Sequence, residues 1–143
     1  MNPLTLEWIE KAEGDYNTAQ RELRARQLPN YNDVCFHTQQ MAEKYLKAVL
    51  QENGVEIPRS HNLIDLMVLC AQGDETFMGF DTHLKNLNEY AVIFRYPGEN
   101  AERDEAREAL KMARDVRIFL RKKTRPVKYL LNETSEFFKN SEV

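Results

Sequence analysis

The fold of this chain is decided by residues 34–50, which read VCFHTQQMAEKYLKAVL. At about 100° per residue, the apolar side chains of this stretch share one broad arc of a helix, with Glu43, Lys44 and Lys47 on the other arc. Gln39 falls inside the apolar arc, so we expect its amide to be buried and hydrogen-bonded. The stretch therefore predicts an amphipathic helix with one wide face in the core.

The same three- and four-residue spacing recurs on both sides of this helix. Before it, the stripe is formed by Trp8 or Ile9, Ala12, Tyr16, Ala19 and Leu23. Gly54 ends the central helix, and Ser60 is the expected N-cap of the next one. A later helix is expected to stop where Pro97 forces Tyr96 out of helical geometry. Strand-like alternation never exceeds a few residues, so the chain is predicted to be all-α.

Length and composition indicate one globular domain. The chain has 143 residues, of which 42% are hydrophobic, and it contains no run of about 18 apolar residues that would cross a membrane. We expect a bundle over residues 1–125 and, over residues 126–143, a short docking helix or a partly disordered tail. The start lacks the pattern of a secretion signal, and two cysteines are too few for a disulfide framework. These features favour a cytoplasmic protein with no membrane partner.

Positive charge is concentrated near the C-terminal end of the predicted bundle. Residues 111–128 carry eight Lys or Arg against one acid, so this segment is +7 and the rest of the chain is −10. Such a segment can attract nucleic acid or an acidic partner, or it can meet an acidic face of its own domain or of a second subunit. Six basic side chains of residues 103–121 share one helix face, which we treat as a candidate phosphate or partner surface: Arg103, Arg107, Lys111, Arg114, Arg117 and Arg121. This basic stripe has few interleaved aromatic residues, so RNA binding there would be weak and dependent on salt.

Several kinds of chemistry have no support in the sequence. The three histidines, His37, His61 and His83, form no chelating pair, and we expect no metal site. No glycine-rich phosphate loop is present, and no cofactor is expected apart from a possible nucleotide ligand. Cys35 lies in the apolar arc, which is typical of a packed residue and not of a nucleophile. We therefore assign no catalytic residue.

Four motifs occur in the order of one known family. Residues 36–48, FHTQQMAEKYLKA, resemble the second-helix signature of the HEPN superfamily (higher eukaryotes and prokaryotes nucleotide-binding domain). The spacing of Trp8, Ala12, Asp15 and Ala19 resembles the first helix of the family. Residues 60–63, SHNL, resemble the start of its third helix, and residues 95–97, RYP, resemble a variant of the end of its fourth.

The resemblance implies a fold and a biological setting. The implied fold is an antiparallel, up-and-down bundle of four main helices, here with one or two short extra helices. Members are commonly homodimers and are often encoded beside a minimal nucleotidyltransferase as a toxin–antitoxin-like pair. Many relatives are metal-independent ribonucleases that use an arginine followed, after four to six residues, by a histidine. In that chemistry the histidine transfers protons and the arginine stabilises charge on phosphorus.

The sequence departs from the ribonuclease pattern at its decisive position. Arg95 matches the arginine, but the seven residues after it are YPGENAE, and no histidine follows His83. What remains is a polar cluster that the resemblance would bring together at one side of the bundle: His37, Gln40, Lys44, Lys47, His61, Arg95 and Tyr96. Cationic groups and an aromatic ring suit a phosphate and a base. A purely structural role stays open, because Glu43 with Lys47 also fits a surface pair and Arg95 could pair with Asp15.

These observations lead to one functional expectation and two alternatives. We expect a non-catalytic HEPN-type module that binds a nucleotide or a partner and works with a minimal nucleotidyltransferase. One alternative is a metal-independent ribonuclease toxin with a rearranged active site, in which His37 or His61 supplies the missing proton transfer. The other is a structural dimer with no ligand.

Overall fold

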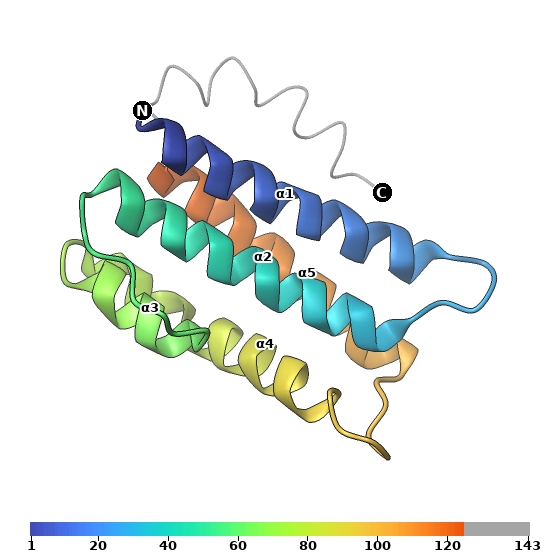
Figure 1. Ribbon diagram of the computed structural model, residues 1–143. Helices are drawn as coiled ribbons and strands as arrows, with labels where there is room; N and C mark the ends of the chain where they lie inside the picture. The colour runs from blue at the N-terminus through green and yellow to red at the C-terminus, as the bar shows by residue number, and fades with distance from the viewer. Residues whose placement is uncertain (125–143) are drawn as a thin grey trace.

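The structure, a computed structural model, describes residues 1–124, which form five α-helices and one short 3₁₀-helix (Figure 1). The elements are α1 (Pro3–Arg24), α2 (Tyr31–Glu52), α3 (Leu63–Ala71), η1 (Glu75–Phe80), α4 (Asp81–Ile93) and α5 (Arg103–Thr124). No strand occurs between residues 1 and 124, and the predicted all-α class is confirmed. The predicted C-terminal extension over residues 126–143 lies outside the described part of the chain.

The four longest helices run antiparallel, with α2 in the middle of the bundle (Figure 1). The helix α2 packs against α1, α3, α4 and α5, whereas the shorter α3 and η1 lie against each other and against α4. The arrangement is the expected up-and-down bundle of four main helices with two short extra ones. Because α2 has neighbours on nearly every side, its polar residues must find partners on other helices.

The core is built from the predicted apolar stripes. On α1 the buried side chains recur every three or four residues, as a helix requires for one face to meet its neighbours. Each remaining α-helix contributes its own buried set. The largest fully buried side chains are Ile9, Tyr16, Met41, Tyr45, Leu46, Leu50, Leu63, Leu66, Met67, Leu84, Leu87 and Leu120.

Asparagine side chains begin three of the helices. The side-chain oxygens of Asn2, Asn30 and Asn62 each accept a hydrogen bond from a backbone N–H in the first turn of α1, α2 and α3. The prediction that Ser60 caps the third helix is wrong. The Ser60 hydroxyl lies 3.1 Å from a carboxylate oxygen of Asp65 and 3.1 Å from the backbone nitrogen of Asn62. Ser60 therefore shapes the loop before the helix, and the helix starts two residues later than expected.

The end of α4 also differs from its prediction. The α-helix stops at Ile93 and not at the residue before Pro97. Beyond it, the N–H of Arg95 bonds to the carbonyl of Val92 and the N–H of Tyr96 to that of Ile93, which are the tighter i to i−3 bonds of a narrowing last turn. Arg95 consequently belongs to this terminal turn and not to the body of the helix.

Candidate functional site

One polar cluster joins α1 to α2 around Asp15. The Asp15 carboxylate accepts a hydrogen bond of 2.8 Å from Nδ1 of His37 and one of 2.6 Å from Nζ of Lys44. A carboxylate can only accept, so Nδ1 of His37 carries the proton and Nε2 is left for another partner. Asp15 therefore links two helices, and it does not pair with Arg95.

A second cluster is centred on Glu43 of α2 and joins this helix to the loop before α3. One of its carboxylate oxygens lies 3.0 Å from Nζ of Lys47 and 3.2 Å from Nδ1 of His61. Glu43 and Lys47 are both buried, so the prediction that they face outward as a surface pair is wrong. The reason is tertiary: the loop that carries His61 into α3 covers this side of α2, and the sequence of α2 alone cannot show that cover.

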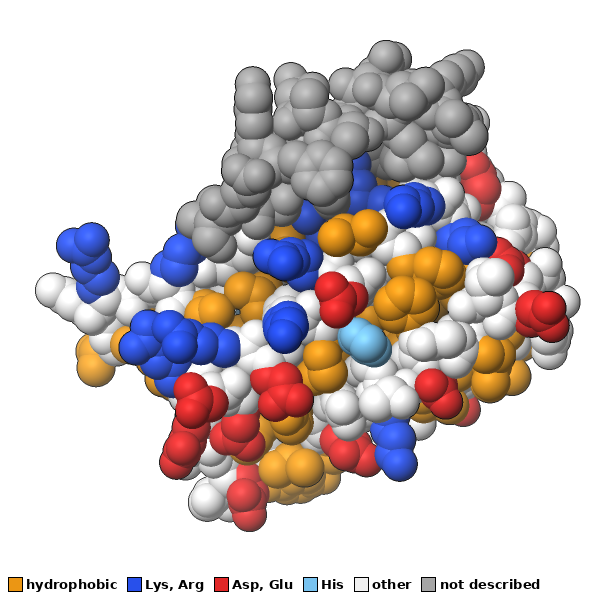
Figure 2. All heavy atoms as spheres, turned by 180° about the vertical axis from the view of Figure 1, so that it is seen from behind, with side chains coloured by type: hydrophobic (Ala, Val, Ile, Leu, Met, Phe, Trp, Pro, Cys, Tyr) orange, Lys and Arg blue, Asp and Glu red, His pale blue; other side chains and the backbone are white. Residues whose placement is uncertain are grey.

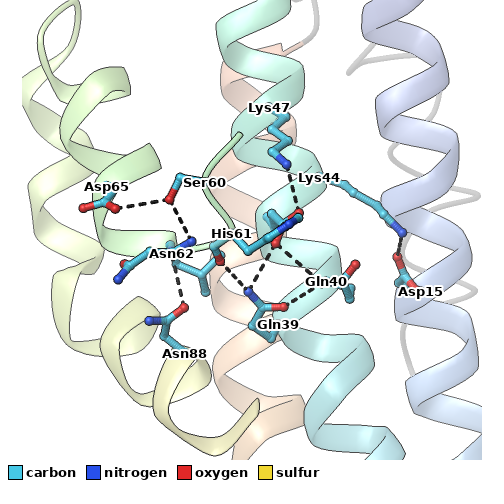
Figure 3. A network of polar contacts seen from close by, with 12 residues as sticks. Asp15, Gln39, Gln40, Lys44, Lys47, Ser60, His61, Asn62, Asp65 and Asn88 are labelled. Carbon is cyan, nitrogen blue, oxygen red and sulfur yellow. Dashed lines mark hydrogen bonds and ion pairs between the residues drawn. The ribbon is translucent and has the colours of Figure 1, made fainter. Parts of the chain in front are cut away.

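Amide side chains fix this loop in place. The amide nitrogen of Gln39 donates to the carbonyl oxygen of His61 at 3.0 Å, and its amide oxygen accepts from Gln40 at 2.9 Å. Asn88 on α4 accepts a hydrogen bond of 3.2 Å from the backbone N–H of Leu63 (Figure 3). The predicted burial and hydrogen bonding of Gln39 are confirmed. Together these bonds hold the His61 backbone between α2 and α4.

A groove of about 290 Å³ opens beside this loop, between α2 and the end of α4. It lies next to the Glu43 cluster, because His61 belongs to both. Its walls combine one aromatic ring, three amides, a histidine, an arginine and two small apolar side chains. The lining residues are Phe36, Gln39, Gln40, His61, Asn88, Ala91, Val92 and Arg95.

The structure brings together only part of the predicted polar cluster. Gln40, His61 and Arg95 line the groove. Tyr96 is 60% exposed and does not contribute to the lining. The other three predicted residues point elsewhere: His37 and Lys44 bind Asp15, and Lys47 is buried against Glu43.

The two ionisable groups of the groove differ in how firmly they are held. The His61 side chain is 79% exposed, yet its Nδ1 is hydrogen-bonded to Glu43, so Nε2 is the ring nitrogen available to a ligand. Within residues 1–124 the Arg95 guanidinium makes no hydrogen bond or ion pair. Five unused N–H donors in a planar fork suit a phosphate or carboxylate. The groove can therefore accept an anionic group at Arg95 and a hydrogen-bonding group at His61.

Sequence reasoning missed several residues that build the site. Phe36 and Asn88 line the groove, and the Glu43 carboxylate is hydrogen-bonded to Nδ1 of His61. A weak signal existed for Glu43, because it follows Gln39, a residue placed in the core, by one helical turn. Nothing in the spacing of α2 and α4 indicates that Phe36 and Asn88 line the same groove, because that depends on how these two helices are rotated against each other.

The predicted basic stripe is shorter than expected. Arg117 and Arg121 are buried and both bind Glu13 of α1: Nε of Arg117 lies 2.7 Å and Nη1 of Arg121 lies 2.9 Å from its carboxylate. The Tyr45 hydroxyl donates to the same carboxylate at 2.6 Å. Burial alone would raise the pKa of Glu13, but the hydrogen bonds and positive charge of Arg117, with Tyr45 and Arg121, hold it below the usual value of 4.5. Part of the positive segment therefore meets an acid of its own domain.

The rest of the stripe stays on the surface. Arg103, Arg107, Lys111 and Arg114 are exposed, and Figure 2 shows basic side chains gathered on one face of the molecule with acidic side chains beside them. Lys122 and Lys123 are exposed as well, so burial removes only Arg117 and Arg121 from the positive surface of α5.

Within residues 1–124, neither the cysteines nor the possible metal ligands form a reactive site. Burial raises the pKa of both Cys35 and Cys70 to about 12, so each is a protonated thiol at neutral pH. No group of three or more His, Cys, Asp or Glu in this range is arranged to hold a metal ion. Over the same residues, none of the helices has the length and apolar character needed to cross a bilayer.

Comparison with known proteins places these features in a family. The family model of the HEPN domain matches residues 5–123. A Methanocaldococcus jannaschii protein named "Putative toxin MJ1304" is 31% identical over 126 residues, covering 76% of this chain and 80% of that protein. The crystal structure of TT1696 from Thermus thermophilus has a TM-score of 0.71 and 26% identity, covering 83% of this chain and 97% of that one. ST0689, an archaeal HEPN homologue, shares the fold with a TM-score of 0.68 at 22% identity, over 85% and 98% of the two chains.

Proposed function

The chain belongs to the HEPN family, and from that premise we propose that it is the binding component of a toxin–antitoxin-like pair. Its role is recognition: the groove between α2 and α4 takes a nucleotide or a segment of a partner protein. The observation that carries this proposal is Arg95, a guanidinium without a partner in residues 1–124 that lines one groove with His61 and Gln40.

The groove has the composition of a small recognition site. Its volume of about 290 Å³ is at the lower end of small-molecule pockets, which fits one nucleotide unit or one side-chain cluster of a partner. Arg95 supplies a bidentate contact to phosphate or carboxylate, and the half-exposed ring of Phe36 supplies a surface for a base or an aromatic side chain. Binding needs no proton transfer, so the missing histidine after Arg95 does not impair it.

The partner assignment has separate support. The Methanocaldococcus jannaschii relative carries the name of a toxin, and the family resemblance adds a minimal nucleotidyltransferase and a homodimer. Several large apolar side chains around the groove are exposed: Phe36, Val92, Ile93 and Tyr96. Apolar side chains gathered beside an arginine are typical of protein interfaces, so we propose that this rim contacts the partner or the second subunit.

A binding experiment with a matched control tests the proposal. We expect nucleoside phosphates to raise the melting temperature of the wild type, because a ligand that binds only the native state stabilises it. Arg95→Ala should abolish this shift or the capture of a co-expressed nucleotidyltransferase, and Tyr96→Phe tests the rim. Arg21→Ala removes the same charge from the exposed face of α1 and should change neither. If Arg95→Ala and Tyr96→Phe both behave as wild type, the groove is structural and the proposal is wrong.

The ribonuclease alternative gains one specific observation. His61 and Arg95 share the groove, and the hydrogen bond from Nδ1 to Glu43 fixes the ring with Nε2 available for proton transfer. In such a pair, Nε2 of His61 could take the proton of an RNA 2′-hydroxyl as this hydroxyl attacks phosphorus. Arg95 would stabilise the charge that develops on the phosphate oxygens. The imidazolium of His61 formed in this step, or a water molecule, then donates a proton to the leaving 5′-oxygen, and the RNA ends in a 2′,3′-cyclic phosphate.

Cleavage assays separate this alternative from pure recognition. RNA incubated with the purified protein and a metal chelator should stay intact under the recognition proposal. Cleavage that is lost in His61→Ala and retained in His37→Ala and His83→Ala would replace recognition by catalysis. The His37 variant is an informative control because His37 also binds a carboxylate, but it lies outside the groove lining.

A further inference from the structure

A second concave site lies where α1 ends and α5 begins, away from the groove. It has a volume of about 530 Å³ and is lined by residues from the end of α1, the following loop, the start of α2 and the first turns of α5. The lining residues are Leu23, Arg24, Ala25, Arg26, Pro29, Tyr31, Arg103 and Arg107. Half of them are arginines: Arg24 and Arg26 belong to the end of α1 and the loop after it, and Arg103 and Arg107 belong to α5, far along the sequence.

These arginines are not neutralised by the protein. Arg26, Arg103 and Arg107 make no hydrogen bond or ion pair with residues 1–124. Arg24 uses Nε to donate to the carbonyl oxygen of Gln20 at 3.2 Å, which leaves its two terminal nitrogens available. Four guanidinium groups around one cavity repel one another, and an anion bound between them would remove that repulsion.

The acids near the cavity form no ion pair with its four arginines. The Glu22 carboxylate accepts the backbone N–H of Asn30 at 2.6 Å, and the Glu105 carboxylate accepts the backbone N–H of Glu102 at 2.9 Å. Asp104 and Glu102 are exposed at the start of α5 and form no ion pair with the four arginines. The positive potential of the cavity is therefore not cancelled by a carboxylate in contact with it.

The walls and backbone also suit a bound group. Leu23, Pro29 and the half-buried Tyr31 give the cavity an apolar side. In the loop between α1 and α2, Leu28 has a positive φ of 47° and is 95% exposed. A non-glycine residue in this conformation costs about 1 kcal/mol or more. The bend at Leu28 lies between Arg26 and Pro29, which both line the cavity.

We propose that this arginine pocket binds an oligophosphate, a small ligand with two or three linked phosphate groups. Each guanidinium can form two parallel hydrogen bonds to phosphate oxygens, and four of them match the charge of a triphosphate chain. A free oligophosphate fits better than a nucleic acid backbone, because the arginines converge on a cavity. The other exposed basic residues of the stripe, Lys111 and Arg114, do not line it.

Calorimetric titration with inorganic triphosphate tests this site. Arg26→Gln with Arg107→Gln removes two pocket charges, and Lys111→Gln with Arg114→Gln removes two charges from α5 outside the pocket. We expect triphosphate to bind the wild type more tightly than orthophosphate or sulfate. The pocket variant should bind about tenfold or more weakly, and the control variant should stay within about twofold of wild type. All four side chains are exposed, and circular dichroism checks that each variant is folded.

Three outcomes would overturn the proposal. Equal losses in the two double variants would mean general charge attraction and no pocket. Triphosphate binding no stronger than sulfate binding would mean that linked phosphates are not recognised. A ten-nucleotide single-stranded RNA that binds more tightly than triphosphate, and depends equally on both pairs, would indicate an extended nucleic acid surface. The pocket variant should keep the rise in melting temperature that a nucleoside monophosphate gives through the groove, so a failure here is distinguishable from a failure of the groove.

Discussion

Glu43→Gln should destabilise the bundle strongly, because it removes one charge of a buried ion pair. Glu43 and Lys47 lie 3.0 Å apart, with side chains only 5% and 8% exposed. Glutamine has nearly the same shape as glutamate, so packing is retained and the charge is the main change. The Lys47 ammonium would then be left in the interior without an anionic partner.

The size of the effect follows from the burial. Removing one partner of a buried ion pair costs about 3–5 kcal/mol. The Trp8 ring, whose centroid lies 5.6 Å from Nζ of Lys47, and the glutamine oxygen offset part of this cost. We therefore expect a loss near the lower limit, about 3 kcal/mol, from a total that is about 5–15 kcal/mol for a typical domain. For a chain of this length that corresponds to a melting temperature about 10 °C lower.

A double variant separates the charge from the packing. Glu43→Leu with Lys47→Met replaces both members by apolar side chains of similar volume, which is commonly neutral or stabilising for a buried pair. Urea unfolding of wild type, single and double variants measures the three free energies. The explanation fails if Glu43→Gln unfolds within about 1 kcal/mol of wild type, or if the double variant is no more stable than Glu43→Gln. A stable double variant should still lose ligand binding in the groove, because His61 has lost its carboxylate.

Three further predictions concern other parts of the bundle. Because the pKa of Glu13 is held below 4.5 in the folded protein, its stabilising contribution is complete above pH 4.5 and is lost as the pH falls through the folded value. Glu13→Gln should lower stability at neutral pH and flatten its decline in acid, as urea unfolding from about pH 6 to about pH 3 would show. Cys35 and Cys70, buried and with pKa values raised to about 12, should react with iodoacetamide only after unfolding; mass spectrometry of native and denatured samples checks this. Asn62→Ala removes the cap of α3 and should cost about 1 kcal/mol in urea unfolding, whereas Ser60→Ala should cost less.

The apolar pattern was enough to predict the helices, because the core of a bundle is repetitive. Ile9, Ala12 and Tyr16 recur at helical spacing, and all three are buried. Such a pattern depends only on residues close in sequence. The burial of charged residues depends instead on partners that are far away in the sequence. Arg117 meets Glu13, 104 residues away along the chain, and no local spacing contains that pairing.

The site was predicted only in part, because its contacts also depend on residues that are far apart in the sequence. The family resemblance pointed to His61 and Arg95, and the structure places both in one groove. The resemblance could not show that Lys47 binds Glu43 or that His37 binds Asp15. Charged side chains on successive turns of α2 point in different directions, and this helix has neighbours on nearly every side. The direction of each side chain depends on which carboxylate a neighbouring helix or loop presents to it.

The pairing of Arg117 and Arg121 with Glu13 also changes where an anion would approach. The sequence concentrates positive charge in residues 111–128, but these two arginines are buried and paired, and Lys123 binds Asp74 at 2.7 Å. Four arginines that make no hydrogen bond or ion pair within residues 1–124 lie at the opposite end of the bundle, where α1 and α4 end and α5 begins (Figure 1): Arg26, Arg95, Arg103 and Arg107. Both proposed anion sites, the groove with Arg95 and the arginine pocket, belong to that end. Because exposed charges are screened over about 8–10 Å at physiological salt, these arginines should attract an anion that comes close to this end of the molecule, even though the chain as a whole carries a net charge of −3.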